Sequence, residues 1–218
     1  MKQSQIKLSI IIPAWKYRGY IEEAIDSLRK QTNQDFEVII VSDSNKDKYE
    51  ILNDSFIKHI FLDTEEHPTY KINKGFEIAS GKYITVLSDD DMLEETFVEK
   101  MTFKMDKGYD IVYSDMKVFG KRNYFSPASD EWTLSQFKIS TVPYITSMVT
   151  SDMFKLVDGY QDICSYWDWD FWFKCFTKGA KHYHLKEPLF LYRSTEANES
   201  SFKQDEKLRQ IVLDKHCK

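Results

Sequence analysis

The sequence predicts an α/β domain with a mainly parallel central sheet and helices on both faces of that sheet. Two observations support this prediction. Short apolar runs, typical of buried strands, alternate with segments of helical periodicity through the first half of the chain, and the connections between them are short. Such an order favours parallel strands joined by right-handed crossovers. The length of 218 residues suits one domain with a full hydrophobic core.

In the first half, four apolar runs predict strands, at 8–12, 38–41, 60–62 and 83–87, and Pro13 is expected to end the first of them. A helix is expected from Tyr20, because apolar residues recur there at i, i+3, i+4 and i+7. Two further helices are expected, at 49–56 and at 70–79, and Gly81 stops the second.

The second half is less regular. It predicts helices at 94–105, 132–137 and 151–156, strands at 110–113 and 143–149, and a polar, irregular stretch at 117–130. An aromatic-rich helix is expected to start near Tyr166. A last short strand ends at 190–193, and a terminal helix follows the polar tail that begins at Ser194.

The stretch 83–93 organises the chain. An apolar run ends there in three consecutive carboxylates, Asp89, Asp90 and Asp91. Open α/β sheets bind ligands at the carboxyl ends of their strands, and a divalent cation with oxygen ligands would offset three adjacent like charges. The alternative is a solvated acidic turn in which Asp91 caps the next helix.

Other polar residues also follow predicted strands. Trp15 and Lys16 come after the first strand, and Asp43 comes after the second. Because the carboxyl ends of parallel strands share one edge, these side chains are expected to converge with the three aspartates on one crevice. This convergence favours a ligand site over an acidic turn.

Asp168 and Asp170 lie among the aromatic residues of the predicted helix start, beside Trp167 and Trp169. Desolvation there would raise the pKa of a carboxyl group and make it a better base. The alternative is that both acids belong to the first helical turn and face water, and for Asp170 we favour that alternative.

Composition narrows the class of protein. The net charge of −5 argues against a protein that mainly binds nucleic acid non-specifically. No apolar run approaches the roughly 20 residues that cross a bilayer, and the N-terminus lacks the apolar core of a signal peptide. Three cysteines without metal-ligand spacing favour a reducing compartment, so a cytoplasmic location is expected.

Six segments together resemble the family 2 glycosyltransferases, nucleotide-sugar enzymes with the Rossmann-like GT-A fold. The resemblance implies a single domain, with a nucleotide-sugar-binding half at 1–115 and an acceptor-binding half with a C-terminal tail at 116–218. In order along the chain, the six segments are LSIIIPAW, AIDSLRKQT, VIIVSDSNKD, NKGFEIASGKYITVLSDDD, SYWDWDFWFKC and EPLFLYR.

The resemblance also implies roles for individual residues. Asp168 would be the general base, Asp91 or Asp90 would bind Mg²⁺ or Mn²⁺, and Asp43 would accept a hydrogen bond from the base, for example from a uracil N–H. The implied nucleotide-sugar site comprises Pro13, Ala14, Trp15, Asp43, Asn73, Asp89 and Asp90, and the implied acceptor wall comprises Trp167 and Trp169.

The sequence departs from the family pattern at several positions. Lys71 could supply the charge of the family's usual Arg, whose place Ile72 takes, and the His that often follows the closing Tyr-Arg pair is absent. Other departures are Ser88 and Trp167 where the family often has an acid, and Trp15-Lys16 where it usually has Tyr-Asn.

The activity that the resemblance implies is metal-dependent, inverting transfer of a sugar from a UDP-sugar to a glycan or lipid-linked saccharide. One alternative is a phage-type enzyme that glycosylates a hydroxylated base in DNA, with phosphate contacts from Lys117, Lys121, Arg122 and Lys138. Another alternative is an inactive module that only binds a nucleotide sugar.

Overall fold

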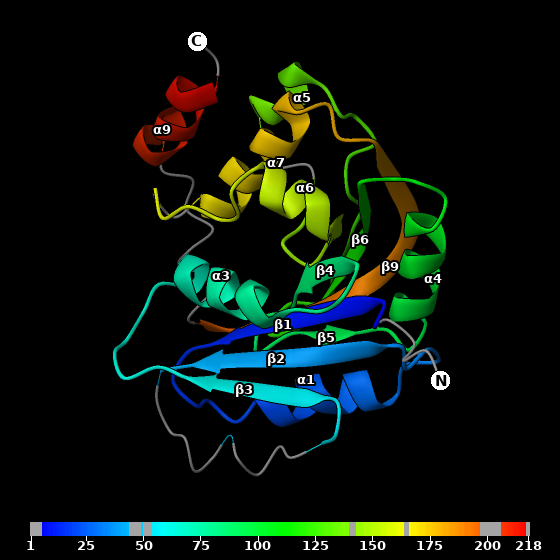
Figure 1. Cartoon of the computed structure of the whole chain (residues 1–218). Coiled ribbons are helices and arrows are strands. Elements are labelled where there is room, and N and C mark those ends of the chain that lie inside the picture. Colours follow the sequence, from blue (N-terminus) through cyan, green and yellow to red (C-terminus); the bar gives the residue numbers. More distant parts are fainter. Residues whose placement is uncertain are drawn as a thin grey trace.

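The computed structural model describes residues 6–43, 49, 54–139, 143–163, 166–196 and 206–216. A nine-stranded sheet runs through the molecule, with helices packed on both of its faces, as Figure 1 shows. The strand order is β3-β2-β1-β4-β8-β6-β9-β5, and β7 pairs with β6 beside this path. The predicted α/β class with a mainly parallel central sheet is therefore confirmed.

The parallel part of the sheet comes from the first half of the chain. It contains β1 (Leu8–Ala14), β2 (Phe36–Ser42), β3 (Ile57–Phe61) and β4 (Tyr83–Val86). The expectation that Pro13 ends the first strand is wrong, because Pro13 pairs with Val41 of β2. Its missing N–H is tolerated since the pairing of β1 with β4 already stops at Ile11.

The second half extends the sheet through β8 (Met148–Thr150), β6 (Ile111–Gly120), β9 (His182–Ser194), β5 (Met92–Leu93) and β7 (Tyr124–Ser126). The expected irregular stretch at 117–130 is thus partly wrong, because it contains the end of β6 and all of β7. The expected short last strand is in fact a 13-residue strand, paired in parallel with β6. Because this pairing joins segments that are far apart in the sequence, no local sequence pattern predicted it.

Each face of the sheet has its own core. Ile10 and Ile12 of β1 pack with α1 (Ile21–Arg29) and α4 (Phe97–Met105), whereas Ile11 points to the opposite face. That second face is covered by α3 (Pro68–Ile78), α5 (Leu134–Phe137), α6 (Ser151–Leu156), α7 (Trp167–Thr177) and α9 (Glu206–His216).

Other predicted helices differ from the structure in their boundaries or lie largely outside the described residues. The helix expected from residue 94 begins at Phe97, because Met92 and Leu93 pair with β9 instead. Most of the helix expected at 49–56 lies outside the described residues, as do Cys164 and Cys217. Cys175 is buried and forms no disulfide with any described residue. Of the helices that the structure describes, none has the length and apolar character needed to span a bilayer.

Candidate functional site

The three consecutive aspartates form a buried turn directly after β4. Asp89, Asp90 and Asp91 are only 6%, 8% and 1% exposed. They do not cap a helix, because β5 follows them and α4 begins later, at Phe97. The alternative of a solvated, helix-capping acidic turn is therefore wrong.

Segments from distant parts of the sequence meet at this acidic turn. The backbone N–H of Trp15, at the end of β1, donates to Asp89 Oδ2 over 3.3 Å. From β9, the backbone N–H of Arg193 donates to Asp91 Oδ1 over 2.8 Å, and its Nε donates to the carbonyl oxygen of Asp90 over 2.7 Å. The ends of β1, β4 and β9 thus surround the same carboxylates, as the argument from strand ends predicted for Trp15.

Arg18, which the sequence analysis did not single out, is the side chain that partly neutralises this turn. Its Nη2 lies 2.6 Å from Asp89 Oδ1 and 3.1 Å from Asp90 Oδ2. Burial raises the pKa of Asp89, and the charge of Arg18 opposes that rise. The only sequence signal for this role is the position of Arg18 in the loop that follows β1.

Asp91 is the most strongly perturbed acid of the turn. Burial and the neighbouring charge of Asp90 raise the pKa of Asp91 well above its ordinary range. Its Oδ2 atom is buried and has no hydrogen-bond partner among the described residues. An orphaned carboxylate oxygen beside a second carboxylate suits a hard divalent cation.

The acidic turn could supply at most part of a cation's coordination. No group of three or more His, Cys, Asp or Glu residues that could hold a metal ion occurs in the part of the chain that the structure describes. Mg²⁺ in particular is often held by one or two carboxylates, with water and substrate phosphates completing the shell. Asp90 and Asp91 therefore fit a cation that arrives with a phosphorylated ligand.

Asp43 lies at the end of β2 in a second buried charge pair. Lys71 Nζ of α3 is 2.5 Å from Asp43 Oδ2, and it also donates to the carbonyl oxygen of Ala14 over 2.8 Å. Helix α3 comes close enough for these contacts because Gly75, one turn after Lys71, packs against Ile11. A Cβ at Gly75 would lie 2.6 Å from Ile11 Cγ2, so a larger residue would push the helix away.

The exposed side chain at the end of β1 is aromatic. Trp15 is 44% exposed, and its Nε1 donates to Glu65 Oε1 over 2.7 Å. Lys16 Nζ lies 4.6 Å from the centre of the Trp15 ring. Ala14 is buried and Pro13 is half-buried, so Trp15 is the most accessible of the three residues that were assigned to a nucleobase pocket.

Asp168 lies in the first turn of α7, where its Oδ1 accepts a hydrogen bond from the backbone N–H of Trp169 over 2.8 Å. The side chain is partly accessible, yet burial raises the pKa of its carboxyl group. Sequence reasoning predicted this direction. A carboxylate with a raised pKa is a stronger base than an ordinary surface aspartate.

The start of α7 is tied to α3, the helix that carries Lys71. Asn73 donates from Nδ2 to the carbonyl oxygen of Tyr160 over 2.8 Å, and its Oδ1 accepts from the backbone N–H of Tyr160 over 3.1 Å. Trp167 packs edge-on against both Tyr160 and His67. Asn73 thus holds the segment that precedes α7, and its expected contact with a donor stays a prediction.

Two residues close to Asp168 in the sequence, Trp169 and Asp170, are more buried than expected. Trp169 is only 3% exposed, which counts against its predicted place in an acceptor wall, whereas Trp167 is partly exposed. The preference for a water-facing Asp170 is wrong, because this side chain is fully buried. Its Oδ1 accepts hydrogen bonds from His216 and Lys215 of α9, over 2.6 and 2.8 Å.

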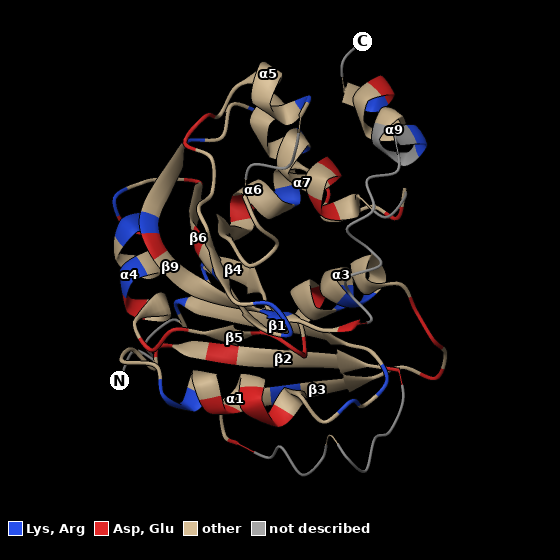
Figure 2. Ribbon diagram, turned by 180° about the vertical axis from the view of Figure 1, so that it is seen from behind, with Lys and Arg blue, Asp and Glu red and all other residues tan. Residues whose placement is uncertain are grey.

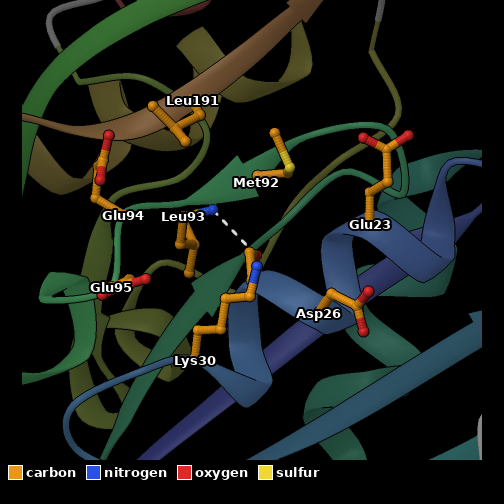
Figure 3. A pocket seen from close by; sticks show the side chains of 9 residues that line it. Glu23, Asp26, Lys30, Met92, Leu93, Glu94, Glu95 and Leu191 are labelled. Atoms are coloured by element: carbon orange, nitrogen blue, oxygen red, sulfur yellow. Dashed lines mark hydrogen bonds between the residues drawn. The ribbon is translucent and has the colours of Figure 1, made fainter.

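A cavity of about 300 Å³ opens between α1, β5 and β9, and Figure 3 shows its lining. At its base the backbone N–H of Leu93 donates to Ser27 Oγ over 3.2 Å. The cavity is linked to the acidic turn by Met92, which directly follows Asp91, and by Glu23, which pairs with Arg193. Its lining residues are Glu23, Asp26, Ser27, Lys30, Met92, Leu93, Glu94, Glu95 and Leu191.

Comparison with known proteins decides the family. The model of glycosyl transferase family 2 matches residues 9–159. The chain belongs to glycosyltransferase family 2. An uncharacterised glycosyltransferase of Rickettsia typhi is 29% identical over 90% of this chain and 67% of its own length. The GalNAc(5)-diNAcBac-PP-undecaprenol beta-1,3-glucosyltransferase of Campylobacter jejuni is 25% identical over 69% of this chain and 51% of its own length.

The fold of this family 2 chain matches that of solved structures. S. aureus TarS in complex with UDP-GlcNAc superposes with a TM-score of 0.80 at 20% identity, over 94% of this chain and 64% of that one. The predicted GT-A fold is thereby confirmed. The chain spans about half to two thirds of the length of the curated relatives named above. The segments around Asp168 and Arg193 lie beyond the family match, which ends at residue 159.

Proposed function

We propose that this family 2 glycosyltransferase moves a sugar from a UDP-sugar to an acceptor hydroxyl, with inversion at the anomeric carbon and with help from Mg²⁺ or Mn²⁺. The observation that carries the proposal is the buried, incompletely neutralised acidic turn at the carboxyl end of β4, with Asp91 Oδ2 left without a partner. Support for UDP comes from TarS, which has been solved in one complex with UDP-GlcNAc and in another with UDP.

In this proposal Asp90 and Asp91 hold the cation and Asp89 lies near the ribose or the diphosphate. When bound, the cation would offset the negative charge that develops on the departing diphosphate. The remaining steps fall to the protein. The indole of Trp15 and the segment Pro13–Ala14 would line the nucleobase site, and Asp43, held by Lys71, would accept a hydrogen bond from uracil.

Asp168 is the proposed general base. The acceptor hydroxyl attacks the anomeric carbon from the side opposite the diphosphate, Asp168 takes the hydroxyl proton, and the bond between the anomeric carbon and the diphosphate oxygen breaks. Burial raises the pKa of Asp168, which suits proton transfer nearer to neutral pH than an ordinary aspartate would allow. Attack and departure on opposite sides invert the configuration.

The proposed acceptor is a glycan or a lipid-linked saccharide. The name of the Campylobacter relative, which specifies an undecaprenol-linked acceptor, supports this class. Trp167 is the accessible aromatic residue beside Asp168 and could stack on an acceptor sugar. A cytoplasmic location is part of the proposal and is supported by the cysteine content.

The structure offers no particular support for the DNA alternative. Lys117, Lys121 and Arg122 lie around the β6–β7 hairpin, and Lys138 follows α5. In the view of Figure 2, Lys and Arg positions are spread over several elements and interspersed with acids. Salt-sensitive binding to duplex DNA would revive this alternative.

The decisive experiment measures UDP release from a panel of UDP-sugars, with a mixture of glycan and lipid-linked acceptors, in Mn²⁺ and in EDTA. We expect metal-dependent release with at least one sugar, and loss of that release in Asp168→Asn. A thermal-shift titration with the same sugars runs in parallel. Binding without any turnover would instead support the inactive nucleotide-sugar-binding module.

A further inference from the structure

Arg18 makes an unusual set of contacts for a loop residue. Its guanidinium is shared between Asp89 and Asp90, at 2.6 and 3.1 Å, and its side chain is only 29% exposed. The carboxylates that it binds include one of the two proposed cation ligands, Asp90. An arginine charge and a bound divalent cation would therefore compete for overlapping oxygen atoms.

The loop that carries Arg18 contains two residues with a left-handed backbone. Lys16 has a φ of 43° and Gly19 a φ of 80°, so left-handed residues bracket the position on both sides. No atom lies within 4 Å of the place that a Cβ on Gly19 would take, which shows that the turn is open there. Apart from its two carboxylate partners, the Arg18 guanidinium lies near the ring of Tyr20, 5.8 Å from the ring centre.

We propose that Arg18 is a built-in, exchangeable counter-ion of the acidic turn. While the donor site is empty, Arg18 neutralises Asp89 and Asp90. When a divalent cation binds together with a diphosphate, Arg18 gives up these carboxylates and donates to the phosphate oxygens instead. This inference rests on the proposed function, since it assumes that the acidic turn receives a cation-bound diphosphate.

The exchange has a thermodynamic consequence. Asp91 Oδ2 is already without a partner, so the cation would find one ligand ready and would have to displace Arg18 from the other. Without a nucleotide, the displaced guanidinium would lose the two carboxylates that are its charged partners among the described residues, so cation binding is weak. With a nucleotide, the diphosphate receives the guanidinium, so cation and nucleotide reinforce each other's binding.

The test compares Mn²⁺ binding to the wild-type protein and to Arg18→Gln by titration of the free-ion electron paramagnetic resonance signal. Without nucleotide, the variant is expected to bind Mn²⁺ at least about fivefold more tightly, the lower end of a typical coupling between sites. With saturating UDP, the difference in Mn²⁺ affinity between the variant and the wild type is expected to become smaller, because only the wild type gains a contact from Arg18 to the diphosphate.

Arg29→Gln is the matched control. Arg29 also bridges two carboxylates, with Nη1 2.6 Å from Asp26 and Nη2 2.5 Å from Asp54, but it lies on α1 away from the acidic turn. It should leave Mn²⁺ affinity unchanged. Arg18→Lys, which keeps the charge, should bind Mn²⁺ like the wild type or only slightly more tightly.

Two results would overturn the proposal. One is a nucleotide-free Mn²⁺ affinity of Arg18→Gln that is equal to or weaker than that of the wild type, including the case in which neither protein binds. The other is an advantage of the variant that does not shrink with UDP. Failure of the proposed function looks different, because it would appear as absent UDP-sugar turnover whatever residue occupies position 18. A circular dichroism spectrum and melting curve establish that each variant is folded.

Discussion

Lys71 Nζ and Asp43 Oδ2 lie 2.5 Å apart, and both side chains are at most 2% exposed. The pair connects α3 to the carboxyl end of β2, and the second hydrogen bond of Lys71 connects it to Ala14 at the end of β1. One buried ammonium group thus fastens a helix to two strand ends that border the proposed donor site. Removing either partner would leave an uncompensated charge in the interior.

Lys71→Met is therefore expected to destabilise the fold by about 3–5 kcal/mol, the usual cost of breaking a buried pair from one side. Chemical denaturation measures this loss. Lys74→Met is the control on the same helix, because Lys74 is partly exposed and forms a surface ion pair with Glu77; it should change stability by less than about 0.5 kcal/mol. A double variant, Lys71→Met with Asp43→Asn, should recover part of the stability, and no recovery would contradict the ion-pair explanation.

Asp168→Asn is expected to reduce kcat by about 10²–10⁴-fold, the usual contribution of a general base, and to leave the KM for the donor nearly unchanged. The amide oxygen can still accept from the N–H of Trp169, so the helix start should keep its structure. Asp162→Asn, at a 62% exposed side chain in the preceding loop, is the control. Steady-state kinetics that showed a full kcat in Asp168→Asn would remove the base assignment.

The pH dependence of activity should reflect the environment of Asp168. Because burial raises the pKa of this carboxyl group, the ionised base is lost on acidification at a higher pH than for an ordinary aspartate, whose pKa is about 3.9. The acidic limb of kcat against pH is thus expected above that value. A limb at or below it would show that the catalytic base is another group.

Asp91→Asn separates stability from function. The folded-state pKa of Asp91 is raised, so the folded protein holds this proton more tightly than the unfolded chain does. The stabilisation that comes from this protonated carboxyl group is fully present below the pKa of Asp91 in the unfolded state. It is lost as the pH rises through the pKa of Asp91 in the folded state. In EDTA at neutral pH the variant should therefore melt at a higher temperature than the wild type.

The same variant should lose the response to metal. Replacing a proposed direct ligand is expected to weaken Mn²⁺ binding, measured with UDP present, by at least the roughly tenfold loss that outer-shell substitutions cause. Its Oδ1 can still accept from the N–H of Arg193, which protects the local fold. Unchanged Mn²⁺ affinity would exclude Asp91 as a ligand.

A substitution at Asp170 tests how much the contacts of α9 contribute to the stability of the fold. Burial alone would raise the pKa of Asp170, but hydrogen bonds from His216 and Lys215 outweigh burial and hold the pKa below its ordinary value. The stability that these contacts supply is present above the unfolded pKa and is lost as pH falls through the folded pKa. Asp170→Asn should therefore cost about 1–3 kcal/mol at neutral pH, and less in acid.

Asp214→Asn is the control for that change, because Asp214 lies on α9 but is exposed and bonds only to Gln210 among the described residues. Urea denaturation at neutral and acidic pH measures both variants. A cost for Asp170→Asn that did not depend on pH would show that the charged form of Asp170 is not what holds α9.

The sequence by itself determined the parallel half of the sheet, the acidic turn and the start of α7. A strand buried on both faces needs a continuous apolar run, and a strand end needs polar residues. The local sequence of β1, β2 and β4 therefore shows both features. The family resemblance was readable for the same reason, since its motifs coincide with these strand ends. The raised pKa of Asp168 also followed from its aromatic neighbours in sequence.

Only the tertiary structure decided which charges meet. The pairing of Arg18 with Asp89, of Lys71 with Asp43 and of Asp170 with His216 joins residues 28 to 71 positions apart. The long pairing of β6 with β9 is equally non-local. Local periodicity records which face of an element is buried, but the energy of an ion pair or a strand ladder depends on a partner that the chain brings near only on folding.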